Sequence, residues 1–144
     1  MRISTRTRYG FRALAELAKG YPDKPISLKQ ISSHQNVSLK YLEQVIAALK
    51  AAGIVRAVRG NSGGYLLTKS PEQMTLKDAF LALEGTPILL NCLDEPAQCG
   101  TLDGCPTRKT WEDIEKAILN VLDSTTVEDL HKESMKSSPP DYII

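Results

Sequence analysis

The order of secondary structure is clearest in residues 27–67, which read SLKQISSHQNVSLKYLEQVIAALKAAGIVRAVRGNSGGYLL. Ser27 followed three residues later by Gln30 is a capping-box pattern, so we expect a short helix to begin there. After a tight connection at 34–37, Ser38 caps a longer helix that ends at a glycine. The inward face of this longer helix carries Leu42, Val45, Ile46 and Leu49.

A β-hairpin is predicted directly after this longer helix. The β-prone runs 54–59 and 65–67 flank the five residues Gly60-Asn61-Ser62-Gly63-Gly64. Upstream of residue 27, helical spacing is found at Phe11, Leu14, Ala15 and Ala18. The order helix, short helix, tight turn, helix, hairpin is that of a winged helix-turn-helix. The expected fold class is therefore mostly α with a small β-hairpin wing.

The rest of the chain is expected to be helical outside one irregular segment. Thr75 with Asp78 begins a helix that closes at Gly85, and periodicity then stops from 87 to 106. It resumes in a long helix whose apolar stripe is Trp111, Ile114, Ile118, Val121 and Leu122. We expect a winged helix-turn-helix domain at 1–85, a cysteine-containing loop at 86–107, a long helix and a short final helix at 108–133, and a tail at 134–144.

Charge is distributed unevenly along a chain whose formal net charge is only +1. Residues 1–70 carry twelve Lys/Arg and three acidic residues, whereas residues 71–144 carry six Lys/Arg and fourteen acidic residues. A folded basic half is typical of a surface that binds a polyanion, most often nucleic acid. Neither a membrane span of roughly 18 apolar residues nor a signal segment is recognisable, so we expect a cytoplasmic protein without a membrane partner.

The helix that begins at Ser38 takes the place of a recognition helix, which meets the DNA major groove with its N-terminal residues. Glu43 is its most informative residue, because a carboxylate there repels phosphate unless it accepts a hydrogen bond from cytosine N4. A solvated face with an accidental mixture of polar residues is the alternative. The candidate DNA-binding side chains on this helix are Ser38, Lys40, Tyr41, Glu43 and Gln44.

The hairpin tip strengthens the nucleic-acid interpretation. Arg59 stands beside Gly60, Asn61 and Ser62, and glycines allow a backbone to approach DNA closely. An arginine at this tip fits a narrow minor groove, where the negative potential is strongest. Arg2 in the basic N-terminal region is a further candidate DNA contact. An ordinary surface turn is the alternative, but helix, hairpin and basic half together favour binding to double-stranded DNA.

Three cysteines, Cys92, Cys99 and Cys105, lie within fourteen residues of the aperiodic segment. In a cytosolic protein this clustering favours metal binding or redox activity over a structural disulfide framework. Thiolates suit iron–sulfur clusters or zinc, and Gly/Pro-containing spacers let a chain wrap around a metal. Spacing alone also leaves a disulfide bridge or three free thiols open.

Several motifs resemble those of the Rrf-two family of bacterial winged-helix transcriptional regulators, which has IscR-, NsrR- and CymR-like members. The resemblance runs from residue 1 to about 130. It implies a homodimer formed through the helix near 108–124, recognition-helix contacts at Tyr41 and Glu43, and a wing contact at Arg59. The matching segments are Met1-Arg2-Ile3-Ser4 with Arg8-Tyr9, Tyr41-Leu42-Glu43-Gln44, Val58-Arg59-Gly60 and Gly63-Gly64-Tyr65-Leu66-Leu67.

The resemblance also implies an iron–sulfur cluster in members that carry a cysteine triad, and it leaves [2Fe-2S] and [4Fe-4S] both open. Cluster-binding members space their cysteines five and five, whereas the first spacer here has six residues. Arg108 stands where some members have a ligating His, and Arg8 stands where others have an acidic ligand. The fourth ligand is therefore unassigned. Nearby candidates that are also compatible with simple solvation are Asp94, Glu95 and Asp103.

We expect a dimeric DNA-binding regulator that senses iron–sulfur cluster status, redox state or nitric oxide through a cysteine-ligated cluster. One alternative is a cluster-free thiol- or partner-sensing regulator of cysteine or sulfur metabolism. Another, from a different class, is a zinc-stabilised protein-interaction module. An enzyme is not expected, because the chain has only two His and neither a P-loop nor a nucleophile–base motif.

Overall fold

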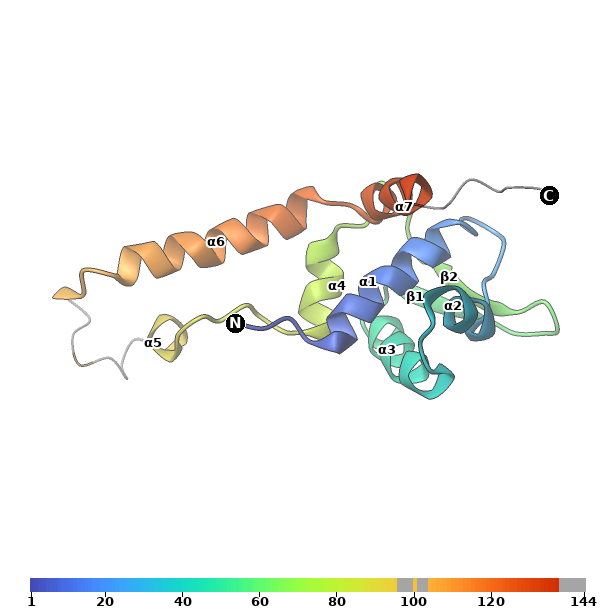
Figure 1. The fold of residues 1–144 in the computed structure, drawn as a ribbon, viewed down its shortest axis with the longest axis horizontal. Helices are drawn as coiled ribbons and strands as arrows, with labels where there is room; N and C mark the ends of the chain where they lie inside the picture. The colour runs from blue at the N-terminus through green and yellow to red at the C-terminus, as the bar shows by residue number, and fades with distance from the viewer. Residues whose placement is uncertain (96–99, 101–103, 138–144) are drawn as a thin grey trace.

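The structure is a winged helix-turn-helix body with a long helix that projects from it (Figure 1). This computed structural model describes residues 1–95, 100 and 104–137. The mostly helical fold with one two-stranded hairpin confirms the expected fold class. Its elements are α1 (Thr5–Ala18), α2 (Leu28–Gln35), α3 (Leu39–Ala51), β1 (Val55–Val58), β2 (Gly64–Leu67), α4 (Leu76–Leu83), α5 (Asn91–Asp94), α6 (Arg108–Ser124) and α7 (Val127–Lys136).

The starts of α2 and α3 follow the capping residues that the sequence predicts. Ser27 Oγ accepts a hydrogen bond from the Gln30 backbone N at 3.2 Å, and Gln30 Oε1 accepts one from the Ser27 N at 2.9 Å. Ser38 Oγ accepts from the Tyr41 N at 3.2 Å. At its other end α3 stops before Gly53, whose φ of 75° lies in the left-handed region that favours glycine.

The hairpin is held in a fixed place against the turn that precedes α2. Strands β1 and β2 are antiparallel, with Val55 opposite Leu67. Tyr65 and Ile26 exchange backbone hydrogen bonds of 2.9 and 3.1 Å. Gly64 lies so close to this contact that a Cβ would stand 2.5 Å from the Ile26 carbonyl, which excludes a side chain there.

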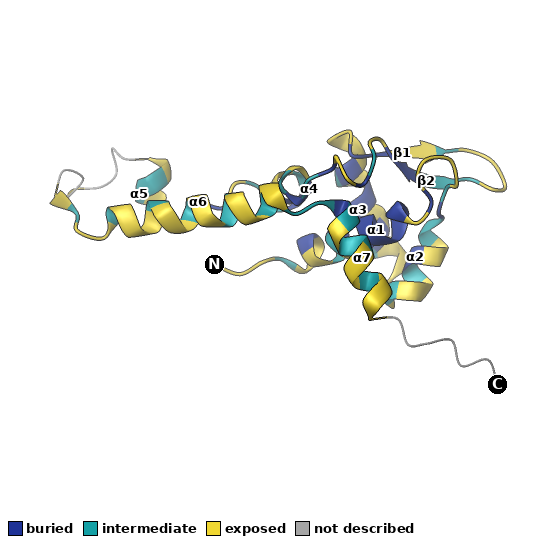
Figure 2. Cartoon of the chain, turned by 90° about the horizontal axis from the view of Figure 1, so that it is seen from above, coloured by how far each residue is buried: buried dark blue, intermediate teal, exposed yellow. Residues whose placement is uncertain are grey.

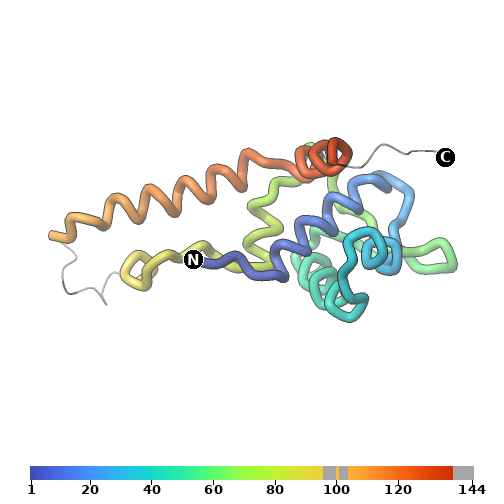
Figure 3. Tube along the Cα trace, in the orientation of Figure 1, coloured from blue at the N-terminus to red at the C-terminus, as the bar shows by residue number. Residues whose placement is uncertain are grey.

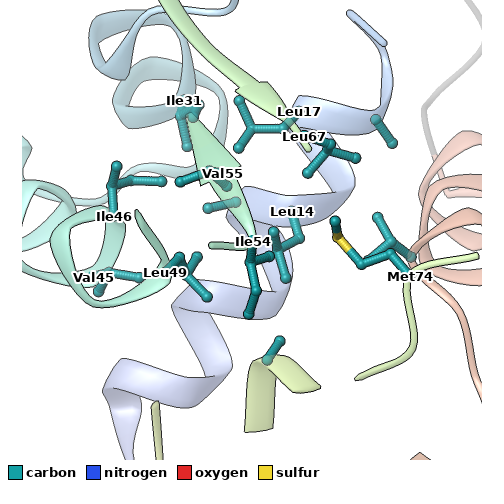
Figure 4. Packing of buried hydrophobic residues seen from close by; sticks show 14 of the residues in the cluster. Leu14, Leu17, Ile31, Val45, Ile46, Leu49, Ile54, Val55, Leu67 and Met74 are labelled. Carbon is teal, nitrogen blue, oxygen red and sulfur yellow. The ribbon is translucent and has the colours of Figure 1, made fainter. Parts of the chain in front are cut away.

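The core lies between α1, α3 and the hairpin (Figure 4). Leu14 and Leu17 of α1 are fully buried, α1 contacts α3 and β2, and Val55 of β1 is 2% exposed. The inward face predicted for the longer helix is confirmed, because each of its members is at most 1% exposed: Leu42, Val45, Ile46 and Leu49. This packing fixes which face of α3 remains in solvent.

Helix α7 closes the body against α1. Val127 is fully buried, and its backbone N donates to the Met74 carbonyl at 2.9 Å. Thr126 and Asp129 form a second capping box at the start of this helix. Thr75, expected with Asp78 to begin a helix, directly precedes α4 but makes no side-chain capping bond.

Helix α6 projects from the end of the body opposite the hairpin, as the Cα trace in Figure 3 shows. The single-turn helix α5 falls in the segment where no helix is expected from the sequence, because four residues are too few to show a period. Among the described residues, no helix has both the length and the apolar character needed to cross a membrane.

Candidate nucleic-acid interface and cysteine segment

The first two turns of α3 present polar side chains to solvent. Lys40, Glu43 and Gln44 are exposed, and so is Ser38. The Ser38 hydroxyl oxygen is used as the helix cap, but the hydroxyl can still donate to an outside acceptor. Because the opposite face of α3 is buried in the core, these side chains point away from the body.

Tyr41 differs from the other candidates because its ring is partly buried. The ring packs edge to face on Tyr9 of α1, with centroids 5.8 Å apart and an interplanar angle of 82°. The Arg12 guanidinium carbon lies 5.1 Å from the Tyr9 ring centroid. The sequence gives no sign of this contact, since no local pattern shows that two tyrosines 32 positions apart will meet.

Leu39 is a candidate that the sequence reasoning missed. It is the first residue of α3 and is 37% exposed, although its neighbour Leu42 is buried. An exposed apolar side chain on a recognition helix is suited to contact with the methyl group of thymine. The sequence feature that could have identified Leu39 is its place directly after the Ser38 cap, before the part of the helix that packs in the core.

The hairpin tip is solvent-exposed and its backbone requires glycine. Arg59, Gly60, Asn61 and Ser62 are all exposed. Gly60 has φ 114°, and its carbonyl accepts from the Gly63 N at 3.0 Å. A Cβ on Gly63 would stand 2.2 Å from the Val58 carbonyl oxygen, so the tight tip excludes a side chain there.

The structure brings α3 and the hairpin tip to the same side of the body. In Figure 1 both lie in the lower half of the body, whereas α6 and α7 lie above. Arg2 is exposed on the N-terminal arm, three residues before Thr5. Thr5, the first residue of α1, lines a shallow depression with Tyr9, Ser38 and Tyr41, so the start of α1 borders the start of α3. The N-terminus and the hairpin tip are far apart in Figures 1 and 2.

An apolar groove runs between the start of α1 and the face of α6. All 17 residues of α6 are described, and none of them is buried (Figure 2). Met1 and Val121 on opposite walls are each 64% exposed. The groove is lined by Met1, Ile3, Thr7, Arg8, Phe11, Phe80, Ile114, Ala117, Ile118, Val121 and Leu122.

Two carboxylates fix α1 relative to its neighbours. Glu84, after α4, accepts hydrogen bonds from the Ser4 N at 3.1 Å, the Ser4 hydroxyl at 2.6 Å and the Thr7 hydroxyl. These bonds lower the pKa of Glu84. Glu16 is only 5% exposed and accepts from Gln35 Nε2 at 2.7 Å, so it joins α1 to the end of α2.

Two of the three cysteines lie in the described part of the chain, and both are partly exposed free thiols. Arg108 Nη1 donates to the Cys92 carbonyl at 3.4 Å, which holds the α5 segment beside the start of α6. Cys105 Sγ lies 3.4 Å from the Thr107 hydroxyl. Hydrogen bonds from the Thr107 hydroxyl and backbone lower the pKa of Cys105, with a contribution from the Arg108 charge.

Among the described residues, no group of three or more His, Cys, Asp or Glu side chains is placed to hold a metal ion. A cluster ligand must be a thiolate, and the hydrogen bonds at the start of α6 favour that form at Cys105. Cys99 and Asp103 lie outside the described residues. Asp94 and Glu95 are exposed near Cys92. Arg108 donates from Nη1 to the Cys92 carbonyl, and its Nε forms an ion pair with Glu112 Oε1 at 2.8 Å.

The chain is similar to known transcriptional regulators over most of its length. The model of the Rrf2 (Rrf-two) family, described as an iron-dependent transcriptional regulator, matches residues 3–133. The HTH-type transcriptional regulator CymR of Bacillus subtilis (strain 168) is 42% identical over 132 residues, which are 90% of this chain and 89% of that protein.

Two solved structures support the same similarity. The structure of CymR (YrzC), the global cysteine regulator of B. subtilis, has a TM-score of 0.77 at 40% identity and covers 92% of this chain and 98% of that one. The structure of T. potens IscR has a TM-score of 0.76 at 35% identity, with coverages of 99% and 95%.

Proposed function

Because this chain belongs to the Rrf2 family of transcriptional regulators, we propose that it binds double-stranded DNA as a cytoplasmic homodimer. The observation that carries this proposal is the position of α3 and the hairpin tip, which both lie in the lower half of the body in Figure 1. A recognition helix and a wing on one side can meet the same duplex. Binding to a pseudo-palindromic site then follows from the twofold symmetry of a dimer.

In this proposal the exposed start of α3 reads the major groove and the wing reaches the minor groove. The polar contacts to base edges and phosphates are made by Ser38, Lys40, Tyr41, Glu43 and Gln44. Arg59 enters the minor groove, and the glycine-rich backbone at Gly60, Asn61 and Ser62 allows the approach. Arg2 on the N-terminal arm contacts a phosphate.

The dimer is proposed to form through α6. A helix whose apolar stripe is unburied in its own chain needs another apolar surface, and the groove between α1 and α6 offers one. A second copy of this chain provides the same groove and the same stripe, which is what a twofold interface requires.

The sensor is proposed to be an iron–sulfur cluster held by Cys92, Cys99 and Cys105. Bound there, the cluster supplies a redox-active centre with thiolate ligation. The hydrogen bond with Thr107 favours the thiolate form of Cys105, and Arg108 holds the Cys92 backbone against α6. Since the cysteine segment directly precedes the dimer helix, a change in its order biases the spacing of the two recognition helices.

A cluster-free regulator of cysteine or sulfur metabolism is the second candidate. It is favoured by the 42% identity to CymR, whose structure is described as that of the global cysteine regulator of its organism. In that case the same thiols, or a partner protein, would provide the signal.

One preparation tests both candidates. The protein is purified without oxygen, and its visible spectrum and iron and sulfide contents are measured beside those of Cys92→Ser. We expect a coloured wild type containing iron and sulfide, and a variant that has lost both. Colourless, iron-free wild-type protein would favour the second candidate.

DNA binding is tested on the duplex that the wild type selects from a randomised pool. Footprints are compared between anaerobic and air-exposed protein, and we expect protection to differ between the two. Equal protection in both would contradict the sensor. Failure to select any duplex at low salt would contradict DNA binding itself.

A further inference from the structure

The contact between Tyr9 and Tyr41 joins α1 to the first turn of the recognition helix. The edge-to-face geometry, with centroids 5.8 Å apart, is the favoured arrangement for two aromatic rings. Both rings are partly buried. Tyr41 therefore does not lie free on the surface of α3: one side of its ring rests on α1.

Arg12 fixes the Tyr9 ring from another direction. Its guanidinium carbon is 5.1 Å from the Tyr9 centroid, within the range of a cation–π interaction. The same guanidinium donates from Nε to Gln35 Oε1 at 2.7 Å and from Nη2 to the Gln35 carbonyl at 3.0 Å. Arg12 is thus held at the end of α2 while it contacts Tyr9.

A buried carboxylate anchors this series of contacts. Gln35 Nε2 donates to Glu16 Oε1 at 2.7 Å, and Glu16 is 5% exposed. Contacts therefore run from Glu16 through Gln35, Arg12 and Tyr9 to Tyr41. They connect α1, α2 and α3 on the side of the body where the recognition helix begins.

We propose that Tyr9 is a positioning residue for DNA recognition, which holds the Tyr41 ring in the orientation used on DNA. The proposal rests on the proposed function, because it requires Tyr41 to contact the duplex. A side chain that is already restrained loses less conformational entropy on binding, so loss of the Tyr9 ring weakens affinity through Tyr41.

A double-mutant cycle separates positioning from general packing. Affinity is measured for the duplex that the wild type selects from a randomised pool, with wild type, Tyr9→Leu, Tyr41→Ala and the double variant. We expect Tyr9→Leu to weaken binding roughly 3- to 10-fold and Tyr9→Phe to restore most of the loss, since the ring contact is retained. In the Tyr41→Ala background, the effect of Tyr9→Leu should disappear.

Tyr21→Leu serves as the matched control, because Tyr21 is a partly exposed tyrosine in the turn that follows α1. It should leave affinity unchanged within about twofold, as expected away from the contact network. Additive effects of Tyr9→Leu and Tyr41→Ala would overturn the proposal while leaving DNA binding intact. An unchanged affinity of Tyr41→Ala for the selected duplex would also overturn the proposal. Failure of the wild type to select any duplex would instead overturn the proposed function.

Arg12→Met keeps the test usable if Tyr9→Leu does not fold, because Arg12 is exposed. Removing its charge from the Tyr9 ring should weaken binding roughly 2- to 5-fold in the wild-type background, in line with an exposed cation–π contact. No loss should be seen when Tyr41 is already alanine. An equal loss in both backgrounds would indicate a direct phosphate contact by Arg12 and would overturn the proposal.

Discussion

Glu16 is the residue on which the junction of α1 and α2 depends. Its carboxylate accepts from Lys19 Nζ at 3.0 Å, His34 Nδ1 at 3.1 Å and Gln35 Nε2 at 2.7 Å. Burial raises the pKa of Glu16, but the hydrogen bonds from His34, Lys19 and Gln35 outweigh it and lower the pKa below its ordinary value. The ionised form is therefore stabilised in the folded protein.

This lowered pKa predicts a specific dependence of stability on pH. The stabilisation is fully present above the unfolded pKa of about 4.3, and it is lost as pH falls through the lower folded pKa. Glu16→Gln should reduce the free energy of unfolding at neutral pH by about 1–3 kcal/mol, because it weakens buried hydrogen bonds. The free energy of unfolding of Glu16→Gln should also fall less than that of the wild type as the pH is lowered. Urea unfolding at a series of pH values measures both.

Glu133→Gln is the control for this prediction. Glu133 pairs with Lys136 at 3.2 Å on the surface, where both side chains are 74% exposed, so its loss should change stability by less than about 0.5 kcal/mol. A Glu16→Gln protein with the same acid dependence as wild type would contradict the role of this carboxylate.

Glu43 and Arg59 are predicted to affect DNA binding in different ways. Glu43→Ala should leave affinity for the selected duplex similar but relax the preference at one base pair, because the carboxylate discriminates by accepting from cytosine. Arg59→Ala should cost about 1–3 kcal/mol of binding free energy. Selection from a randomised duplex pool, followed by affinity measurement, separates the two effects. An unchanged base preference in Glu43→Ala would contradict its contact with a base edge.

Residues that act locally could be predicted from the sequence, and those that act across the fold could not. Ser27 and Ser38 cap their helices as expected, because capping depends on residues within one turn. The bond between Ser4 and Glu84 joins positions 80 apart, and no local pattern encodes it. The exposure of the candidate DNA contacts other than the partly buried Tyr41 agrees with their proposed role, while their contacts with DNA stay predictions.

At the level of elements, packing within the single chain does not account for the apolar stripe of α6. It has 17 residues, so it is about 25 Å long, and none of those residues is buried. An isolated helix is marginal in water and gains most of its stability from packing an apolar face. The sequence predicted the stripe from its spacing, but spacing alone does not say whether the partner lies in the same chain.

Val121→Glu is predicted to dissociate the dimer without unfolding the body. Val121 is 64% exposed in the single chain, so a carboxylate there remains hydrated until a second copy covers it. The dimer dissociation constant should rise at least about tenfold, because burying a lone carboxylate costs more than about 1.4 kcal/mol. Sedimentation equilibrium measures the constant, and circular dichroism checks the fold.

Asn120→Glu is the matched control on the same helix. Asn120 is exposed and is not among the residues that line the groove, so this carboxylate should stay in water in the dimer. Equal association of Val121→Glu and wild type would mean that the groove between α1 and α6 is not the dimer interface.

At the level of the whole molecule, the longest helix of the acidic half projects away from the basic elements, although α4 and α7 of the same half pack in the body against α1. Helices α1 to α3 and the hairpin belong to the basic residues 1–70, whereas the projecting α6 belongs to the acidic residues 71–144. This arrangement orients the molecule on a polyanion. In the proposed complex with DNA, α6 then lies away from the phosphate backbone.

The separation of charge predicts a steep dependence of DNA affinity on salt that arises from the basic half alone. The logarithm of the association constant should fall with the logarithm of salt concentration with a slope of about −0.9 per phosphate contacted, and a dimer makes several such contacts. Lys40→Gln should reduce the magnitude of the slope by about one for each phosphate it contacts. Lys136→Gln removes the same charge from the exposed end of α7 and should leave the slope unchanged, because α7 lies on the other side of the body from α3 in Figure 1. Fluorescence anisotropy on the selected duplex between low and moderate salt gives the slopes. Equal slopes for all three proteins would mean that the exposed start of α3 does not lie along the phosphate backbone.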